Sequence, residues 1–250
     1  MRASIWVLYI FILLVTYSIP GFAYDQEIDM IAKLTLTGNV STLKNGTNNT
    51  NDKNTVKKNV TVLNVDADTS YNSIVTRYKT AVNRLKQQAY SVAAYIKKNN
   101  YSTDYIFLID MSIPSGKNRF FVYNLKKDTL ECSSLVAHGF GSTIKGTECD
   151  LIFSNNNYSC KTSLGKYKIG ALYKGLYGMA YKLYGLDTSN SKAFERAIVL
   201  HSDVHIPDNE TYPAKIFQSA GCPAVSPTFL PILGKYIKGS KKPILMWIYN

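Results

Sequence analysis

A histidine and a cysteine in the C-terminal part of the chain have the surroundings of a catalytic pair. His201 ends the apolar segment RAIVLH at residues 196–201, and Cys222 lies downstream in SAGCPAV at residues 219–225. A cysteine becomes a nucleophile when a nearby base favours its thiolate and a substrate can reach it. We therefore interpret Cys222 as a candidate nucleophile and His201, at the end of a predicted strand, as its candidate base.

The turn around Cys222 has residue types that suit a tight, reactive loop. Gly221 lets the backbone come close to a substrate, and the amide groups of Gly221 and Cys222 are candidate donors to a developing oxyanion. Pro223 has no N–H to donate, whereas Ser219 is expected to hydrogen-bond within the loop or to hold the imidazole. A buried structural cysteine and a hydrogen-bonded histidine are the alternative that the residues alone leave open.

Short apolar runs separated by turn residues predict a domain that is mainly β with a few helices. The first three runs favour an antiparallel meander, and a later run is the strand that ends at His201. Ser226 followed by Pro227 is typical of a helix N-cap and first helical position, and predicts a helix to about Lys238. The predicted strands are DYIFLIDM, RFFVYNL, TLECSSLVAHG, GKYKIGALY, GMAYKLYGL, RAIVLHS and PILMWIY.

The part of the chain before these strands divides into a helix and a polar segment. Apolar side chains recur every three or four positions in residues 71–99, which predicts one long amphipathic helix that packs against the β-rich domain. Residues 24–70 are rich in Asn, Thr and Lys and too poor in apolar residues to form a core, so we predict a disordered segment. The catalytic domain is accordingly assigned to residues 71–250.

Residues 1–23 have the features of a secretory signal peptide. Arg2 precedes an apolar run, and Gly21-Phe22-Ala23 provides small residues for cleavage before Tyr24. An uncleaved membrane anchor is the alternative. We find no second apolar stretch long enough to cross a bilayer, so we expect a periplasmic or secreted protein with no transmembrane span after cleavage.

The formal net charge of +12 at pH 7 indicates a basic protein. An exported basic protein meets cell-wall polymers and lipid head groups as polyanions, so anionic wall polymers are candidate partners. The lysines are scattered and do not form a stripe along one helix, which disfavours nucleic acid as a partner. We expect a monomer.

The cysteines and histidines give no metal site and leave the disulfide pairing open. Four cysteines allow three full pairings, and Cys149 and Cys160 flank a polar loop that a disulfide could staple. If Cys222 acts as a free thiol, at least one of Cys132, Cys149 and Cys160 has no partner for a disulfide within the chain. Three scattered histidines without a Cys-x-x-Cys motif form no ligand set, and no cofactor is implied.

A series of short motifs resembles the murein L,D-transpeptidase catalytic domain family, which is YkuD-like. The motifs occur in the family's order between Tyr105 and Tyr249, and together they are more specific than any one of them. They are LVAHGFGS at 135–142, FSN at 153–155, TSLGKY at 162–167, YGL at 184–186, RAIVLH at 196–201 and SAGCPAV at 219–225.

The resemblance implies a YkuD-like β-sandwich or β-rich domain and a cysteine acyltransferase. In the family, the cysteine attacks the carbonyl of an L-centre that precedes a D-residue in a peptidoglycan stem peptide. An amine then takes the acyl group to form a crosslink, or water takes it and the enzyme is an L,D-carboxypeptidase. Cys222 would be the nucleophile and His201 the base, while Ser219, Ala220 and Gly221 would shape the oxyanion site.

For other residues in these motifs, the resemblance implies a role less specifically. Ser202 occupies the small-residue position after the histidine, and His138 is expected either to line the substrate cleft or to orient a loop. Ala220 and Ala224 depart from the family pattern, which often has a histidine and an arginine or asparagine there. A catalytically inactive wall-binding module of the same fold is therefore an alternative. Papain-like enzymes and wall amidases place cysteine before histidine, the reverse of this chain.

Overall fold

The computed structural model describes residues 80, 82–144, 147–176 and 178–250. Contacts between Cα atoms divide the chain into two units, Met1–Arg84 and Leu85–Asn250, and the fold described below is that of the second unit. The predicted signal peptide at 1–23 and the polar segment at 24–70 lie outside the described residues. Within the described ranges, no helix is both long enough and apolar enough to cross a membrane.

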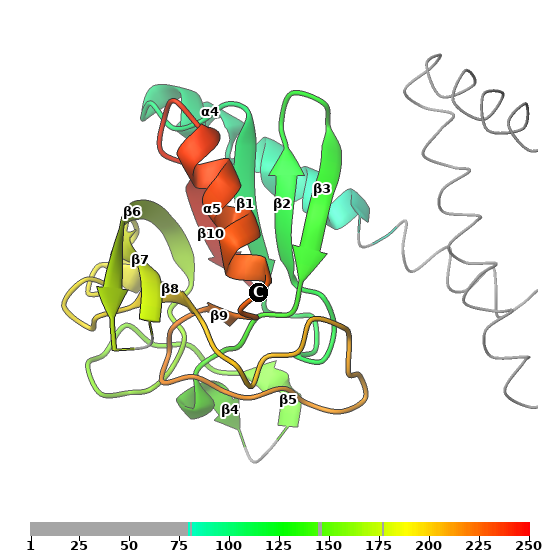
Figure 1. The fold of residues 1–250 in the computed structure, drawn as a ribbon, viewed down its shortest axis with the longest axis vertical. Helices are drawn as coiled ribbons and strands as arrows, with labels where there is room; N and C mark the ends of the chain where they lie inside the picture. The colour runs from blue at the N-terminus through cyan, green and yellow to red at the C-terminus, as the bar shows by residue number, and fades with distance from the viewer. Residues whose placement is uncertain (1–79, 81, 145–146, 177) are drawn as a thin grey trace, which may run out of the picture. The chain divides into compact units, whose positions relative to one another are not determined.

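The centre of the domain is a mixed sheet with the strand order β3-β2-β1-β10-β6-β7-β8-β9 (Figure 1). The predicted meander of the first three strands is confirmed, because β1–β2 and β2–β3 are antiparallel. Two other neighbours, β1–β10 and β8–β9, are parallel. The strands are β1 (Tyr105–Asp110), β2 (Phe120–Asn124), β3 (Thr129–Ser134), β6 (Gly165–Gly175), β7 (Gly178–Gly185), β8 (Val199–Ser202), β9 (Ala224–Val225) and β10 (Leu245–Tyr249).

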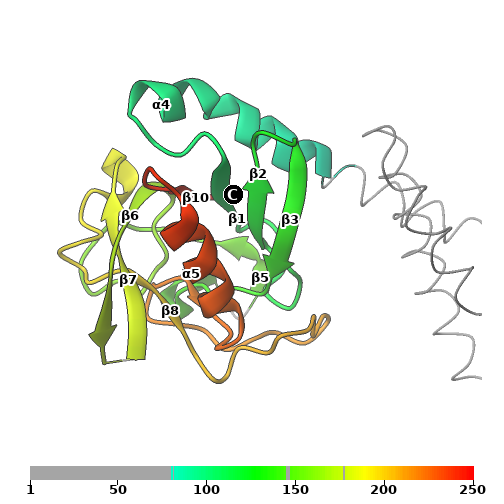
Figure 2. The same cartoon turned by 45° about the horizontal axis from the view of Figure 1, so that its top comes forward.

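A helical segment covers one face of the sheet (Figure 2). It is helical over residues 82–91, has a turn at Val92 and continues as α4 (Ala93–Lys98), which confirms the predicted long helix. Residues 71–79 and 81 of that prediction lie outside the described residues. The predicted apolar stripe packs as expected, in one buried cluster that contains Leu85, Ala89, Val92, Ile96, Tyr101, Ile106, Leu108, Tyr123, Leu245 and Tyr249.

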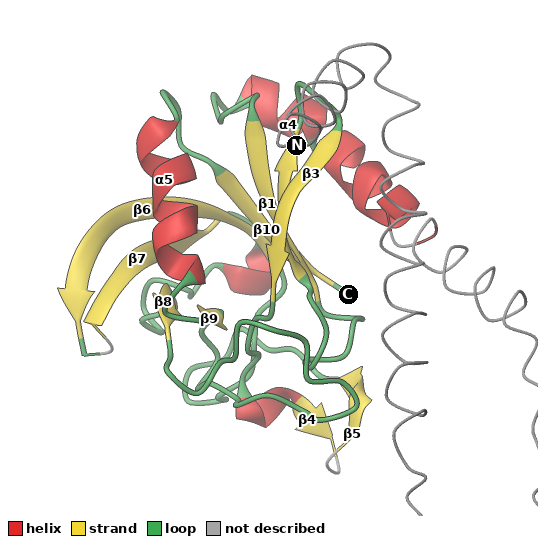
Figure 3. Ribbon diagram, turned by 45° about the vertical axis from the view of Figure 1, so that its right-hand side comes forward, coloured by secondary structure: helices red, strands yellow, loops and turns green. Residues whose placement is uncertain are grey.

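Helix α5 (Phe229–Gly239) packs on the opposite face of the sheet (Figure 3). Its buried side chains Phe229, Leu230 and Leu233 join the cluster that contains Phe107 and Ile109 of β1. Successive side chains of a strand point to opposite faces, so the apolar run of β1 supplies both clusters. The helix begins two residues later than predicted, with Thr228 and not Ser226 at the N-cap position, although the Ser226 hydroxyl accepts a hydrogen bond from the Phe229 N–H at 3.2 Å.

Shorter elements and one long hairpin surround the end of the sheet that carries β8 and β9. Strands β6 and β7 form a hairpin that curves away from β1 and β10 (Figure 3). The shorter elements are the helical turns η1 (Phe140–Ser142) and η2 (Thr188–Asn190), and the two-stranded sheet of β4 (Thr143–Ile144) and β5 (Thr147–Leu151).

Candidate active site

The sheet edge at β8 and β9 brings the predicted histidine and cysteine together. Parallel pairing places His201 of β8 opposite Ala224 of β9. Cys222 comes two positions before Ala224, and its Sγ lies 3.4 Å from the Val199 backbone nitrogen. Val199 is two residues before His201, a span of roughly 7 Å along a strand. The turn that carries Cys222 and the strand that ends at His201 are therefore adjacent at one edge of the sheet, although they are distant in sequence.

His201 has a fixed tautomer. Its side chain is buried, and Nδ1 lies 3.0 Å from the carbonyl oxygen of Ser202. A carbonyl oxygen only accepts hydrogen bonds, so Nδ1 carries the proton and Nε2 of the neutral ring holds the lone pair. Burial lowers the pKa of His201, while the Ser202 carbonyl and the Asp203 carboxylate oppose that shift. The neutral imidazole is thus favoured, with Nε2 as its basic atom.

The Cys222 thiol is held between two backbone groups of the preceding strand segment. Its sulfur accepts from the Val199 N–H, and the S–H lies 3.7 Å from the Ala197 carbonyl oxygen as a donor. Burial raises the pKa of this thiol, and the Val199 N–H and the Arg196 cation lower it in part. The raised pKa of the thiol and the lowered pKa of the imidazole both favour the neutral forms of the two side chains.

Ser219 braces the turn that presents Cys222. Its hydroxyl donates to the Cys222 carbonyl oxygen at 2.6 Å and accepts from the Gly221 N–H at 3.1 Å. Gly221 has a φ of +120°, a conformation that residues with a side chain rarely adopt. The Gly221 N–H is thus engaged by Ser219 in this state. The assignment of the Gly221 and Cys222 N–H groups as oxyanion donors stays a prediction.

His138 is fully buried behind this turn. Arg119 Nη2 donates to His138 Nδ1 at 2.8 Å, and the same guanidinium donates to the Val136 carbonyl oxygen through Nε at 3.0 Å and Nη2 at 2.8 Å. His138 Nε2 therefore carries the ring proton and donates to Thr143 Oγ1 at 3.1 Å, which also accepts from the Gln218 amide nitrogen at 2.6 Å. These contacts place His138 next to the residue that precedes Ser219, in a position that orients a loop.

The glycine that follows His138 allows three segments to meet. A Cβ atom at Gly139 would lie 2.2 Å from the Cys160 carbonyl oxygen and 2.8 Å from Gly221 Cα. Backbone hydrogen bonds join the same segments, from Ser219 N to the His138 oxygen at 2.9 Å and from Phe140 N to the Ser219 oxygen at 2.8 Å. The glycine at this position is therefore required for the close approach to the cysteine turn.

Arg196, the first residue of the RAIVLH motif, lies next to the cysteine turn. It is half-buried, and its guanidinium donates to the carbonyl oxygens of Ser154 at 2.8 Å and Lys161 at 2.6 Å, and to Ser159 Oγ at 3.4 Å. A Cβ atom at Gly221 would lie 3.4 Å from its Nη2. Arg196 thus ties the 154–161 segment to the cysteine turn. In the sequence, the only indication of this role was the position of Arg196 just before the strand that ends at His201.

A cavity of about 280 Å³ opens beside the turn, on the side of Ala220. Ala220 is exposed and lines this cavity two residues before Cys222. The second departure from the family pattern is different, because Ala224 is fully buried in a small apolar cluster. The cavity is lined by Asn157, Tyr158, Cys160, Glu195, Arg196, Ala197, Ile198 and Ala220.

The other candidate residues lie at the periphery or give no metal site. His205 is exposed and pairs with Asp203 at 2.8 Å. Cys132, Cys160 and Cys222 are free thiols, and the side chain of Cys149, the other cysteine of the bridge considered from sequence, lies outside the described part of the structure. In the described ranges, no three or more His, Cys, Asp or Glu residues are grouped so that they could hold a metal ion.

Comparison with known proteins identifies the family. A family model described as the L,D-transpeptidase catalytic domain matches residues 76–249. The chain belongs to this family. The family acts on peptidoglycan, and membership supports a peptidoglycan-modifying function of the L,D-transpeptidase type. None of the curated proteins matches the chain.

Several solved structures are also similar to this family member, at low identity. One from Xylanimonas cellulosilytica is 14% identical, with 59% of this chain and 61% of that chain covered and a TM-score of 0.32. The helical cell shape determining protein Pgp2 from Campylobacter jejuni is 13% identical, with 58% and 47% covered and a TM-score of 0.39. L,D-transpeptidase 1 from Mycobacterium tuberculosis is 10% identical, with 58% and 62% covered and a TM-score of 0.30. The chain thus spans less than two thirds of these proteins.

Proposed function

We propose that the protein is an exported L,D-transpeptidase that forms an acyl-enzyme on Cys222 with murein stem peptides, with His201 as the base. One observation carries the proposal. The Cys222 sulfur is held 3.4 Å from the Val199 nitrogen, two residues before a histidine whose Nδ1 is fixed by the Ser202 carbonyl. A nucleophile, a base and a group that orients the base are the parts that covalent catalysis requires.

The proposed reaction begins with proton transfer. Nε2 of His201 takes the proton from Cys222 Sγ, and the thiolate attacks the carbonyl carbon of the L-centre. The tetrahedral intermediate collapses with cleavage of the C–N bond, and the leaving amine of the D-residue takes the proton from His201. The product is a thioester between Cys222 and the shortened stem peptide. An amine or a water molecule, deprotonated by His201, then attacks the thioester and regenerates the thiol.

The oxyanion and the stem peptide are assigned to groups around the turn. The Cys222 N–H is assigned as a donor to the oxyanion of a carbonyl attacked by its own side chain, and Ser219 fixes the turn that orients it. The cavity beside Ala220 is assigned to the substrate, with Ser202 on the histidine side. His138 is assigned the role of orienting the Gln218–Ser219 segment, which is supported by the hydrogen bond from the Ser219 N–H to the His138 carbonyl oxygen at 2.9 Å and by the shared acceptor Thr143 Oγ1.

The remaining expectations form part of the same proposal. The signal peptide at 1–23 is removed, and the catalytic domain of residues 71–250 works as a monomer in the periplasm or outside the cell. Transpeptidation and L,D-carboxypeptidation are the two outcomes of the same acyl-enzyme. An inactive wall-binding module is disfavoured, because Ala224 lies in the apolar core, where a substrate-binding side chain would not reach a peptide.

Intact mass spectrometry tests the proposal. The chain from Tyr24 is incubated with a disaccharide-tetrapeptide, next to Cys222→Ala, His201→Ala and Cys160→Ala as a matched thiol control. We expect a mass increase equal to the disaccharide-tripeptide acyl group in the unchanged protein and in Cys160→Ala alone. Faster decay of the adduct with an added amine identifies a transpeptidase, and equal decay a carboxypeptidase. A folded protein with a free Cys222 thiol but no adduct would overturn the assignment.

A further inference from the structure

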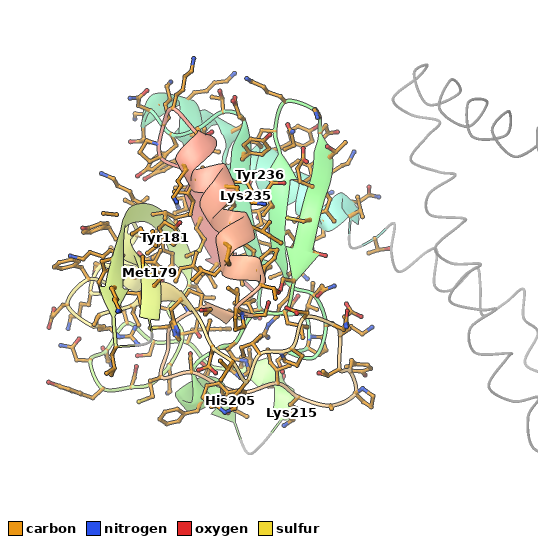
Figure 4. All side chains as sticks on the ribbon, in the orientation of Figure 1. Met179, Tyr181, His205, Lys215, Lys235 and Tyr236 are labelled. Carbon is orange, nitrogen blue, oxygen red and sulfur yellow. The ribbon has the colours of Figure 1, made fainter. Side chains whose placement is uncertain are left out.

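A second cavity, of about 360 Å³, lies between the β6–β7 hairpin and helix α5. Figure 4 shows Met179 and Tyr181 on β7 at one side of this region and Lys235 on α5 at the other. The proposed reaction uses none of these residues. We call this region the hairpin groove, and it is lined by Leu172, Met179, Tyr181, Leu230, Pro231, Gly234, Lys235 and Lys238.

The hairpin groove lies on the opposite face of the sheet from the His201 side chain. Met179 and Tyr181 alternate with Ala180 along β7, so they point to the other face. Ala180 is paired with His201 in the neighbouring strand. Tyr181 faces α5, because its hydroxyl would lie 2.8 Å from a Cβ atom placed at Gly234. A ligand in the groove would therefore leave the histidine face of the sheet accessible.

The groove and the hairpin tip expose an unusual amount of apolar surface. Leu176, at the tip, is 92% exposed, and Met179 and Leu172 are 45% and 38% exposed. Single exposed apolar side chains are ordinary, but a cluster of them on one face marks an interaction surface.

The charge around the hairpin groove has one sign. Residues 151–186, which include the hairpin, contain no Asp or Glu, and neither do residues 211–250, which include α5. Lys235 and Lys238 line the groove. Lys174 lies opposite Met179 in the hairpin, and therefore on the same face. At the start of α5, the Asp208 carboxylate is already bonded to Thr228.

Exposed apolar side chains flanked by lysines complement an anionic lipid bilayer. Apolar side chains enter the boundary between head groups and acyl chains, and lysines beside them attract the phosphates. A soluble wall polymer would match the charge but would leave Leu176 and Met179 in water. An acidic peptide would match the charge of the lysines but would not explain why the apolar hairpin tip is exposed.

We propose that the hairpin groove and the hairpin tip dock the protein onto an anionic lipid bilayer. Leu176, Leu172 and Met179 enter the head-group region, while Lys174, Lys235 and Lys238 contact lipid phosphates. Docking through this face would leave the opposite, histidine face of the sheet directed away from the bilayer. The protein would then work at the membrane surface on material that lies beyond it.

Co-sedimentation with vesicles tests the proposal. The chain from Tyr24 is mixed with vesicles of phosphatidylglycerol and phosphatidylcholine, or of phosphatidylcholine alone. The variants are Leu176→Asp, whose side chain is almost fully exposed, and the pair Lys235→Gln and Lys238→Gln. The matched control is Lys97→Gln with Lys98→Gln in the last turn of α4, which removes the same charge from the other face of the sheet.

We expect binding to the anionic vesicles and little binding to the neutral ones. Each set of groove substitutions should lower the partition coefficient about tenfold or more, since a lysine near an anionic surface and a buried apolar side chain each contribute appreciably. The control pair should change it about twofold at most, because charges beyond the Debye length are screened. Leu176→Trp should show a blue shift of fluorescence with anionic vesicles.

Three results would overturn the proposal. These are no binding to anionic vesicles, an equal loss of binding in the control pair, and binding to soluble polyglutamate with no binding to vesicles. The last would instead assign the groove to an acidic chain. Formation of the Cys222 adduct in solution should be the same in all these variants, so that the docking proposal and the proposed reaction fail independently.

Discussion

Replacing Arg196 should disturb the candidate active site in two separable ways. Its guanidinium joins the carbonyl oxygens of Ser154 and Lys161, at 2.8 and 2.6 Å, to the segment that leads into the histidine strand. The same positive charge lowers the pKa of the Cys222 thiol. Arg196→Met removes both effects, whereas Arg196→Lys keeps the charge but loses the planar fork that reaches two acceptors.

The size of each effect follows from these contacts. A hydrogen bond to a charged group contributes about 1.5–3 kcal/mol, and half-burial of Arg196 favours the lower end of that range. Two such bonds give an expected loss of about 3 kcal/mol in the free energy of unfolding for Arg196→Met. Arg196→Lys, which keeps one bond, should lose about half as much. Loss of the cation should also raise the pKa of Cys222, and each unit lowers the thiolate fraction about tenfold below that pKa.

Two measurements separate the effect of the hydrogen bonds from the effect of the charge. Urea unfolding measures the stability that the Arg196 hydrogen bonds contribute. The rate of iodoacetamide alkylation as a function of pH measures the pKa of the Cys222 thiol. We expect Arg196→Met to change both, and Arg196→Lys to lower stability while it keeps the alkylation profile close to that of the unchanged protein. Glu195→Gln is the control, because Glu195 is an exposed neighbour that contacts the Asn157 side chain.

The outcome that refutes this reasoning is specific. If Arg196→Met unfolds within about 0.5 kcal/mol of the unchanged protein, its hydrogen bonds do not hold the 154–161 segment. If its alkylation profile is also unchanged, the guanidinium does not act on the thiol. An Arg196→Lys profile shifted as far as that of Arg196→Met would assign the effect to loop geometry and not to charge.

Three further predictions concern the turn, the base and the helix. Ser219→Ala should reduce the rate of acyl-enzyme formation by about tenfold or more in single-turnover mass spectrometry, because the Gly221 N–H and the Cys222 carbonyl lose their partner; an unchanged rate would remove Ser219 from the site. Burial lowers the pKa of His201 from 6.5, so below that pH the unfolded state binds more protons than the folded one. Stability should thus be full above about pH 6.5 and fall as the pH decreases towards the lower folded pKa, and His201→Gln should remove this part of the slope in urea titrations. Ile96→Ala should destabilise by about 2–5 kcal/mol in urea, since Ile96 is 1% exposed in the helix–sheet cluster; a loss below about 1 kcal/mol would mean that the helix packs loosely.

Local patterns in the sequence determined most of the secondary structure. The repeat of Leu85, Ala89, Val92 and Ile96 is visible without a structure, because a helix brings every third or fourth side chain to one face. The short apolar runs and the turn residues between them determined the first strands for a similar local reason. The sequence also singled out His201 and Cys222, since residue type and chain order suffice to recognise a candidate base and nucleophile.

Only the tertiary structure decided how these parts meet. Parallel pairing of β8 with β9, and the insertion of β10 between β1 and β6, depend on hydrogen bonds between distant segments, which no local periodicity specifies. The tautomer of His201 follows from a carbonyl whose direction is set by the end of the strand. Arg196 and the hairpin groove were hidden for the same reason. Their roles depend on contacts with residues that are distant in sequence, and those contacts form only in the folded chain.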